Sequence, residues 1–295
     1  MEQNITKYQA FIETARQGSF TRAARRLAYS QSGVSRMVND LEQEWGIRLL
    51  ERGKHGARLT PDGQRILPRI EQICSDQRLL QAEVDNITGM LTGSIRIGTF
   101  SSVATHWLPR AIKRFRDDYP GIDYELLMGD YSEIEAWVDE GRVDIGFLAY
   151  APQKPTLTFE PLGTDELMAV LPEKHRLAHT STVNIADLTR EPFLLLERKG
   201  VDEITPLFVK AGVELRPALS TWDDYTIMSM VESGLGLSIL PALILRRNPY
   251  RLAIRPLTQR AHRTIGLVHR GQDNLSVVAL RFCEYLSRVS QIRRR

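Results

Sequence analysis

Apolar positions in the first sixty residues repeat with the spacing of short helices. The pattern predicts helices over 6–17, 19–27 and 30–44, each with apolar side chains three or four residues apart. Gly18 ends the first helix, and Ser30 stands where a serine caps a helix start. The inward-facing positions are Tyr8, Phe11, Ile12, Ala15, Phe20, Ala23, Ala24, Leu27, Val34, Val38, Leu41 and Trp45. Three small helices with a tight turn between the last two are typical of a helix-turn-helix.

The other face of the third helix carries short hydrogen-bonding side chains and one arginine, which suit base edges and phosphates in a major groove. After Gly46, residues 48–59 read as two extended pieces around a basic, glycine-rich tip, a wing near the DNA backbone or minor groove. An ordinary amphipathic surface helix with solvated charges is the alternative. The residues predicted to contact DNA are Arg22, Ser30, Gln31, Ser32, Ser35, Arg36, Asn39, Arg52, Lys54, His55 and Arg58.

The run GSFTRAARRLAYSQSGVSRMVNDLEQEWGIRLLERGKHGARLTPDG, residues 18–63, resembles the signature of the LysR-type transcriptional regulators. The matching positions are Phe11, Gly18, Ser19, Phe20, Ala23, Ala24, Leu27, Ser30, Gln31, Val34, Ser35, Leu41, Glu42, Gly46, Leu49, Arg52, Leu59, Thr60 and Gly63. Ser32, Trp45 and Leu50 depart from the usual residues of that family. The resemblance implies a winged helix-turn-helix, a linker helix that pairs subunits, and an assembly as a dimer of dimers.

A long helix is predicted to start at Thr60-Pro61-Asp62, which supplies a cap, a proline at the first position and an acid at the positive end. Its apolar seam steps by four and three residues, with a polar interruption at Gln77. The seam comprises Ile66, Ile70, Ile73, Gln77, Leu80, Val84, Ile87 and Leu91. This period favours dimerisation over packing within one domain, the alternative. Pro68 inside the helix predicts a kink or a loosened turn.

From residue 92 onward strands and helices alternate, which predicts a parallel sheet covered on both faces. The segments LPRAIKRFRDDYPGI, VDEGRVDIGF and VESGLGLSILP resemble the LysR effector domain, a two-lobed α/β fold similar to periplasmic binding proteins. The expected domains are a winged helix-turn-helix over 1–60, a linker helix over 61–91 and an effector-binding domain over 92–295, with lobe I at 92–163 and 264–295 and lobe II at 164–263.

In open α/β sheets, ligands bind beyond the carboxyl ends of strands, and a cleft between two lobes is the expected pocket. Hydroxyls at 99–102 suit a carboxylate, although Ser101 or Ser102 could instead serve only as a helix cap. Asp223 or Asp224 in the cleft would favour a cationic or polyhydroxyl ligand, although capping alone is again the alternative. The residues predicted to bind the effector are Thr99, Phe100, Ser101, Ser102, Phe147, Leu148, Gly200, Val201, Thr205, Trp222 and Asp223.

Charge and cysteine content agree with this division. The chain has a formal charge of +3, but residues 1–70 hold 12 Lys and Arg against 7 Asp and Glu, so the basic excess lies at one end. Cys74 and Cys283 have no metal-ligand spacing, and reduced thiols in a cytoplasm are predicted. No apolar run reaches the length of a membrane span, and no secretory signal is recognisable.

The sequence contains no GxSxG, HExxH or P-loop motif, so no enzyme, catalytic residue, metal or cofactor is predicted. We expect a sequence-specific DNA-binding transcriptional regulator controlled by a small molecule between the two lobes. A solute-binding or sensing protein without a gene-regulatory role is the alternative. The expected partners are double-stranded operator DNA, a small-molecule metabolite, a second copy paired through the linker helix, a homotetramer and RNA polymerase, with no membrane.

Overall fold

The chain folds into two compact units. The computed structural model describes residues 2–53, 56–87, 93–199 and 201–291. An N-terminal unit comprises Met1–Gly89 with Glu140–Arg142, and a C-terminal unit comprises Met90–Asp139 with Val143–Arg295.

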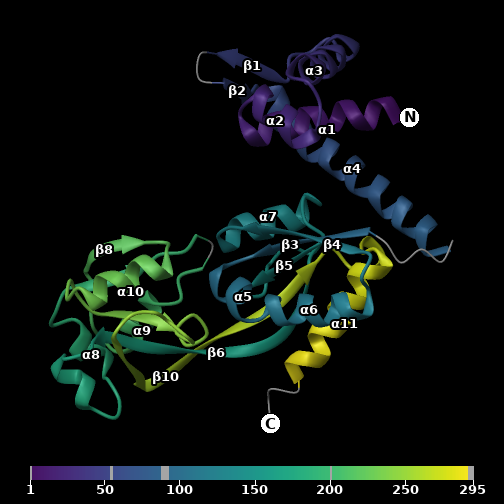
Figure 1. Ribbon diagram of the computed structural model, residues 1–295. Coiled ribbons are helices and arrows are strands. Elements are labelled where there is room, and N and C mark those ends of the chain that lie inside the picture. Colours follow the sequence, from purple (N-terminus) through teal and green to yellow (C-terminus); the bar gives the residue numbers. More distant parts are fainter. Residues whose placement is uncertain (1, 54–55, 88–92, 200, 292–295) are drawn as a thin grey trace. The chain divides into compact units, whose positions relative to one another are not determined.

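The N-terminal unit is a winged helix-turn-helix followed by a long helix (Figure 1). Its elements are α1 (Glu2–Gln17), α2 (Phe20–Leu27), α3 (Gln31–Trp45), β1 (Leu50–Gly53), β2 (Gly56–Leu59) and α4 (Pro61–Ile87). Ser30 caps α3, since its hydroxyl oxygen accepts from the Gly33 N–H at 3.0 Å. Phe11, Val34 and Leu41, three of the predicted inward positions, are fully buried in one core. The apolar spacing therefore predicted these helices and their inner faces.

The wing is an antiparallel hairpin of β1 and β2. The carboxylate of Glu42 on α3 accepts hydrogen bonds from the backbone N–H groups of Leu49 and Leu50, at 2.7 and 3.0 Å, and so ties the hairpin to the helix. A β-carbon on Gly56 would lie 2.2 Å from the carbonyl oxygen of Gly18, so only glycine fits at the start of β2. These contacts fix the wing against the helices of its own unit.

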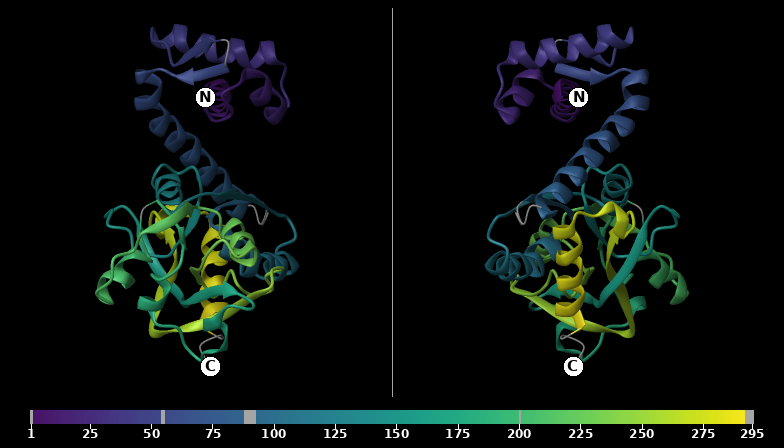
Figure 2. Two further views of the ribbon diagram at one scale, coloured as in Figure 1. Left: turned by 90° about the vertical axis from the view of Figure 1, so that its left-hand side faces the viewer. Right: turned by 90° about the vertical axis from the view of Figure 1, so that its right-hand side faces the viewer.

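The helix α4 runs unbroken through Pro68 (Figure 2). The Thr60 hydroxyl accepts from the Gly63 N–H at 2.9 Å and caps the first turn. Ile70 of the seam is buried in the core of the helix-turn-helix, whereas the later seam side chains are exposed within one chain. The exposed fractions are 45% for Ile73, 64% for Leu80, 44% for Val84 and 77% for Ile87.

The C-terminal unit is built on a six-stranded sheet in the order β4-β3-β5-β10-β6-β9, with a two-stranded sheet of β7 and β8 beside it. The strands are β3 (Gly93–Thr99), β4 (Ile122–Met128), β5 (Ile145–Leu148), β6 (Thr158–Pro172), β7 (Phe193–Leu196), β8 (Pro217–Thr221), β9 (Ser238–Pro241) and β10 (Leu252–His269). β3 pairs in parallel with β4 and β5, but β10 is antiparallel to β5 and β6.

The prediction of a parallel sheet was therefore wrong for three of the five strand pairings in the large sheet, because β5 with β10, β10 with β6 and β6 with β9 are antiparallel. The long strands β6 and β10 run side by side through the whole unit in opposite directions (Figure 1). The sequence pattern predicts only one apolar piece of each strand, 167–171 and 264–268, because the polar central stretches of both strands interrupt the apolar alternation.

Helices cover the sheets and enclose separate cores. They are α5 (Ser101–His106), α6 (Leu108–Asp118), α7 (Tyr131–Asp139), α8 (Ile185–Leu188), α9 (Thr205–Lys210), α10 (Asp224–Glu232) and α11 (Val277–Gln291), with short 3-10 turns η1 (Arg176–His179) and η2 (Gln272–Asn274). One core joins β3, β5, α6, α7 and α11, and we call this half lobe I. Two further cores fill the half that contains β7 to β9 and α8 to α10, which we call lobe II.

Several predicted limits are displaced by a few residues. The apolar pattern predicts a helix near 202–211, but α9 begins at Thr205, because the carboxylate of Asp202 accepts from the N–H groups of Ile204 and Thr205 at 3.0 and 2.9 Å. Such a carboxylate satisfies donors before the first turn, so the residues from Asp202 to Ile204 precede the helix instead of forming part of it.

Candidate functional site

The face of α3 opposite the core is polar and accessible. Gln31, Ser32 and Arg36 are exposed, and Ser35 and Asn39 are half-buried. The opposite face of α3 carries the buried apolar stripe of the helix. The structure therefore presents the predicted reading residues together on one helical surface.

Arg52 joins this surface from strand β1. Its guanidinium donates to the hydroxyl of Ser35 at 3.0 Å and to the amide oxygen of Asn39, and it lies 4.6 Å from the ring centroid of Phe20. The wing and α3 thus form one hydrogen-bonded surface. Because an arginine stays protonated and Arg52 is exposed, its positive charge remains available to an anionic partner.

The other predicted DNA contacts lie on neighbouring elements. Ser30 is occupied as the cap of α3, and its hydroxyl also lies 3.1 Å from that of Ser32. Arg22 on α2 is exposed and donates to the carbonyl of Gln17, and Arg58 on β2 is exposed. Lys54 and His55 lie outside the described residues.

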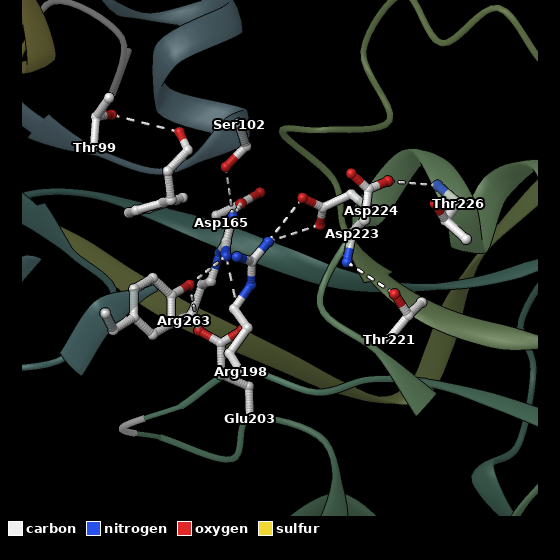
Figure 3. A network of polar contacts seen from close by, with 12 residues as sticks. Thr99, Ser102, Asp165, Arg198, Glu203, Thr221, Asp223, Asp224, Thr226 and Arg263 are labelled. Carbon is white, nitrogen blue, oxygen red and sulfur yellow. Dashed lines mark hydrogen bonds and ion pairs between the residues drawn. The ribbon is translucent and has the colours of Figure 1, made fainter. Parts of the chain in front are cut away.

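A second polar site lies within the C-terminal unit, centred on Arg263 of β10 (Figure 3). The guanidinium donates to the hydroxyl of Ser102 at 2.9 Å, to the phenolic oxygen of Tyr131 at 2.8 Å, and to the carboxylate of Asp165 at 2.7 and 3.0 Å. The side chains of Arg263 and Asp165 are only 2% and 5% exposed. Ser102 and Tyr131 belong to lobe I helices, so Arg263 fastens these helices to the strands that link the lobes.

Lobe II contributes a second buried arginine. Arg198, just after β7, donates to both carboxylate oxygens of Asp224, the first residue of α10, at 2.9 and 2.8 Å. The exposed fractions of the two side chains are 4% and 1%. Burial alone would lower the pKa of Arg198, but the charges of Asp224 and Tyr131 and the hydrogen bonds to Asp224 together outweigh it, so that pKa is raised. Asp223 caps α10 by accepting from the Thr226 N–H at 2.6 Å.

Glu203 completes this network. Its carboxylate lies 3.7 Å from the Arg263 guanidinium and accepts a hydrogen bond from the Tyr131 hydroxyl at 3.2 Å. Burial raises the pKa of Glu203, and the positive charges of Arg263 and Arg198 only partly oppose that rise. The network therefore joins both lobes through charge-assisted hydrogen bonds inside the protein. We call Ser102, Tyr131, Asp165, Arg198, Glu203, Asp224 and Arg263 the inter-lobe network.

The predicted effector residues do not all share one environment. Ser102 belongs to the inter-lobe network, and Asp223 lies next to it as a helix cap. Thr99, Phe100, Phe147 and Leu148 are fully buried, the last three inside the lobe I core. Ser101, Val201 and Thr205 are half-buried, Trp222 is 62% exposed, and Gly200 lies outside the described residues.

Comparison with known proteins assigns the family. Residues 5–64 match the family model described as bacterial regulatory helix-turn-helix protein, lysR family, and residues 88–291 match the LysR substrate binding domain. The chain belongs to the LysR family of transcriptional regulators. Its relatives are regulators and not enzymes. One is the probable HTH-type transcriptional regulator LrrA of Synechococcus elongatus, 35% identical over 265 residues, which cover 89% of each chain.

Other LysR-family proteins match over nearly the whole chain. The uncharacterized HTH-type transcriptional regulator YeiE of Escherichia coli is 30% identical, with 97% of each chain covered. The crystal structure of CbnR, a LysR family transcriptional regulator, superposes with a TM-score of 0.74 at 23% identity and covers 97% of this chain and 99% of CbnR. Full-length CbnR complexed with its target DNA gives a TM-score of 0.71 at 24% identity. The two-lobed LysR architecture predicted from sequence is confirmed.

Most of the inter-lobe network was missed by the sequence reading of this LysR protein, although part of it carries a signal. Asp165 lies two and four residues before the buried Leu167 and Ala169, so it is on the same face of β6. Arg263 likewise lies on the same face of β10 as the buried Ile265. Opposite charges at inward positions of two strands mark a buried pair, and Arg263 and Asp165 do face each other in the register. Recognising them needed the pairing of strands almost a hundred residues apart.

Two further observations bear on the predicted absences. Among the described residues no group of three or more histidine, cysteine or acidic side chains is placed to hold a metal ion. In the same part of the chain, every helix is too short or too polar to cross a membrane. Cys74 and Cys283 are buried free thiols, and burial raises the pKa of Cys283 well above its ordinary value.

Proposed function

We propose that two copies of this LysR-family regulator pair through α4 and place two α3 helices in successive major grooves of operator DNA. The observation that carries this proposal is the surface on which Arg52 joins the wing to Ser35 and Asn39 of α3. It offers donors and acceptors at the spacing of one helix turn, beside a positive charge for the phosphate backbone. The division into a head at 1–60, a linker at 61–91 and an effector-binding domain at 92–295 is part of this proposal.

The exposed seam of α4 supports the pairing. Ile73, Leu80, Val84 and Ile87 lie on one face at the spacing of a coiled-coil seam, and each leaves between 44% and 77% of its surface exposed in a single chain. Burying apolar surface stabilises an interface by roughly 25 cal/mol per Å². A second copy of the same helix supplies a matching apolar face, and a two-fold axis then sets the two heads at one operator.

The effector, in this proposal, binds between lobes I and II. The support is the inter-lobe network, in which residues of both lobes meet around two buried arginines. A ligand that inserts there must exchange its own contacts for some of these bonds. It can change the relation of the lobes only through a difference in its affinity for the two arrangements.

Larger assembly and cell context follow from the family resemblance. We infer a dimer of dimers on DNA, with RNA polymerase as a further partner at the promoter. We place the protein in the cytoplasm, where its DNA target lies.

The oligomeric state tests the pairing directly. Leu80→Asp combined with Val84→Asp places two charges on the seam, and we expect the dimer to dissociate and operator affinity to fall by at least an order of magnitude, because paired heads bind with a high effective concentration. Gln81→Asp, exposed and off the seam, is the matched control. Sedimentation velocity and DNA titration of both variants provide the measurement. A double variant that stays dimeric would overturn the pairing through α4.

A further inference from the structure

The inter-lobe region holds more negative than positive groups. Arg198 is matched by Asp224 and Arg263 by Asp165, each pair in direct contact at 2.9 Å or less. Two further carboxylates lie at the same place. One is Glu203, and the other is Asp130, which directly precedes the network residue Tyr131. A ligand that adds only negative charge would increase this imbalance.

This region contains one hydrogen-bond donor and one hydrogen-bond acceptor that both lack a partner among the described residues. Within the described part of the chain, neither the Nε–H of Arg198 nor the Oδ1 of Asp130 has a hydrogen-bond partner, although both atoms are shielded from solvent. The bonds from Arg198 to Asp224 use only Nη2. Shielded donors and acceptors are nearly always satisfied in proteins, because leaving them unpaired costs free energy. One is a donor in lobe II, and the other is an acceptor at a lobe I helix start.

Arg198 lies near the turn that carries Asp130, and the backbone of that turn is held in place. The Arg198 guanidinium lies 5.5 Å from the ring centroid of Tyr131, the residue next to Asp130. Burial raises the pKa of Asp130, and the charges of Arg198 and Lys199 with the Lys199 backbone N–H oppose that rise. The backbone at Asp130 is fixed because its N–H donates to the Glu133 carboxylate at 2.9 Å.

Space around Gly129, which directly precedes Asp130, is also restricted. A β-carbon on Gly129 would lie 2.5 Å from the ring of Trp137. The Gly129 N–H donates to the carbonyl of Thr99 at 3.1 Å, which ties the turn to the end of β3. The hydroxyl of Ser102, which we predicted to receive a carboxylate, already accepts from Arg263. An anionic group entering this region can accept from the Nε–H of Arg198.

We propose that the effector is a small α-amino acid, whose ammonium group donates to Asp130 and whose carboxylate accepts from the Nε–H of Arg198. This inference rests on the proposed function, because it assumes that the effector binds between the lobes. An ammonium and a carboxylate on one carbon supply a partner for each atom, and because the two charges cancel, the ligand adds no net charge to a region that already holds a surplus of carboxylates. A simple acid leaves the Oδ1 atom of Asp130 without a donor, and a simple amine leaves the Nε–H of Arg198 without an acceptor.

Calorimetric titration of the full-length protein with the standard L-α-amino acids tests the ligand class. Each amino acid that binds is compared with its α-hydroxy acid and with the acid that lacks the amino group. We expect binding by one or a few amino acids, with affinity about tenfold or more weaker for both analogues, the loss expected when a buried charged group loses its partner. Absence of binding by every amino acid, or equal binding by the deaminated acid, would overturn the proposal.

Variants locate the site. Asp130→Asn keeps the shape and removes the negative charge, and Arg198→Lys keeps a cation for Asp224 but removes the Nε–H. Both substitutions should weaken the affinity for the amino acid by about tenfold or more. Asp118→Asn, an exposed carboxylate at the end of α6, should leave affinity unchanged. Because the Oδ1 atom of Asp130 has no partner in the described chain, Asp130→Asn should not lower the melting temperature of the free protein.

The outcomes separate the two proposals. If Arg198→Lys weakens binding while Asp130→Asn does not, and acids without an amino group bind as well, the inter-lobe site stands and the amino acid class is wrong. If an amino acid binds and neither variant changes its affinity, the inter-lobe location is wrong as well.

Discussion

The polar surface of α3 and the inter-lobe network use polar side chains in opposite ways. On α3 the polar residues stay on an accessible face, and the apolar core behind them carries the stability. In the network, arginines and carboxylates are buried and bonded to one another across both lobes. Substitutions on α3 should therefore change binding with little change in stability. Substitutions in the network should change stability and ligand response together.

The largest expected effect is at Arg263. Arg263→Met leaves Asp165 and Glu203 buried without their cation, and we expect a loss of about 3–5 kcal/mol in unfolding free energy, typical when one partner of a buried ion pair is removed. Arg260→Met on the same strand, where the side chain is 67% exposed, should change it by less than about 0.5 kcal/mol. Denaturant titration gives both values. Equal losses of unfolding free energy for the two substitutions would show that the buried ion pair contributes no more to stability than an exposed arginine.

The next effect concerns DNA affinity. Ser35→Ala should weaken operator binding by about 1–3 kcal/mol if the hydroxyl contacts a base. It should leave the melting temperature nearly unchanged, because Ser35 is half-buried and outside the core. Electrophoretic mobility shift and thermal melting measure the two quantities. A loss of stability large enough to explain the whole loss of DNA affinity would mean that Ser35 acts on the fold, as the residues of the inter-lobe network do, and not on DNA contact.

Arg52 tests the role of the α3 surface through the salt dependence of DNA affinity. Arg52→Ala removes a cation and releases Ser35 and Asn39 from their hydrogen bonds. We expect weaker binding to all DNA sequences and a slope of log affinity against log salt that is shallower by about 1. Arg114→Ala, exposed on α6, is the charge-matched control. An unchanged slope for Arg52→Ala would place the wing away from the phosphates.

The smallest effect concerns pH. The pKa of Glu203 is raised above its ordinary value of 4.5, so its contribution to stability is fully present below that value and is lost as pH rises through the folded-state pKa. Glu203→Gln removes this dependence. We expect the variant to gain melting temperature relative to the native chain as pH rises from about 4 to about 8. A difference that shrinks over this range would mean that Arg263 overcomes the burial of Glu203.

The same contrast explains what the sequence could predict. Val34, Val38 and Leu41 recur at helical spacing, so the inner face of α3, and with it the outer face, follows from local periodicity. Asp165 lies on β6, Arg263 on β10 and Arg198 in the loop after β7, and their contacts depend on strand pairing and on the meeting of two lobes. No local spacing encodes such distant contacts. The strands β6 and β10 were incompletely predicted for a related reason, because their polar central stretches interrupt the apolar alternation.

Footprinting of the full-length protein on the DNA upstream of its own gene tests the reading of DNA by paired α3 helices most directly. We predict two protected major-groove segments, separated by one helical turn of about 10 base pairs or a multiple of it. Arg36→Ala should lose this protection at the salt concentration where the native protein keeps it. A single protected segment, or a footprint that Arg36→Ala leaves intact, would contradict the reading of DNA by paired α3 helices.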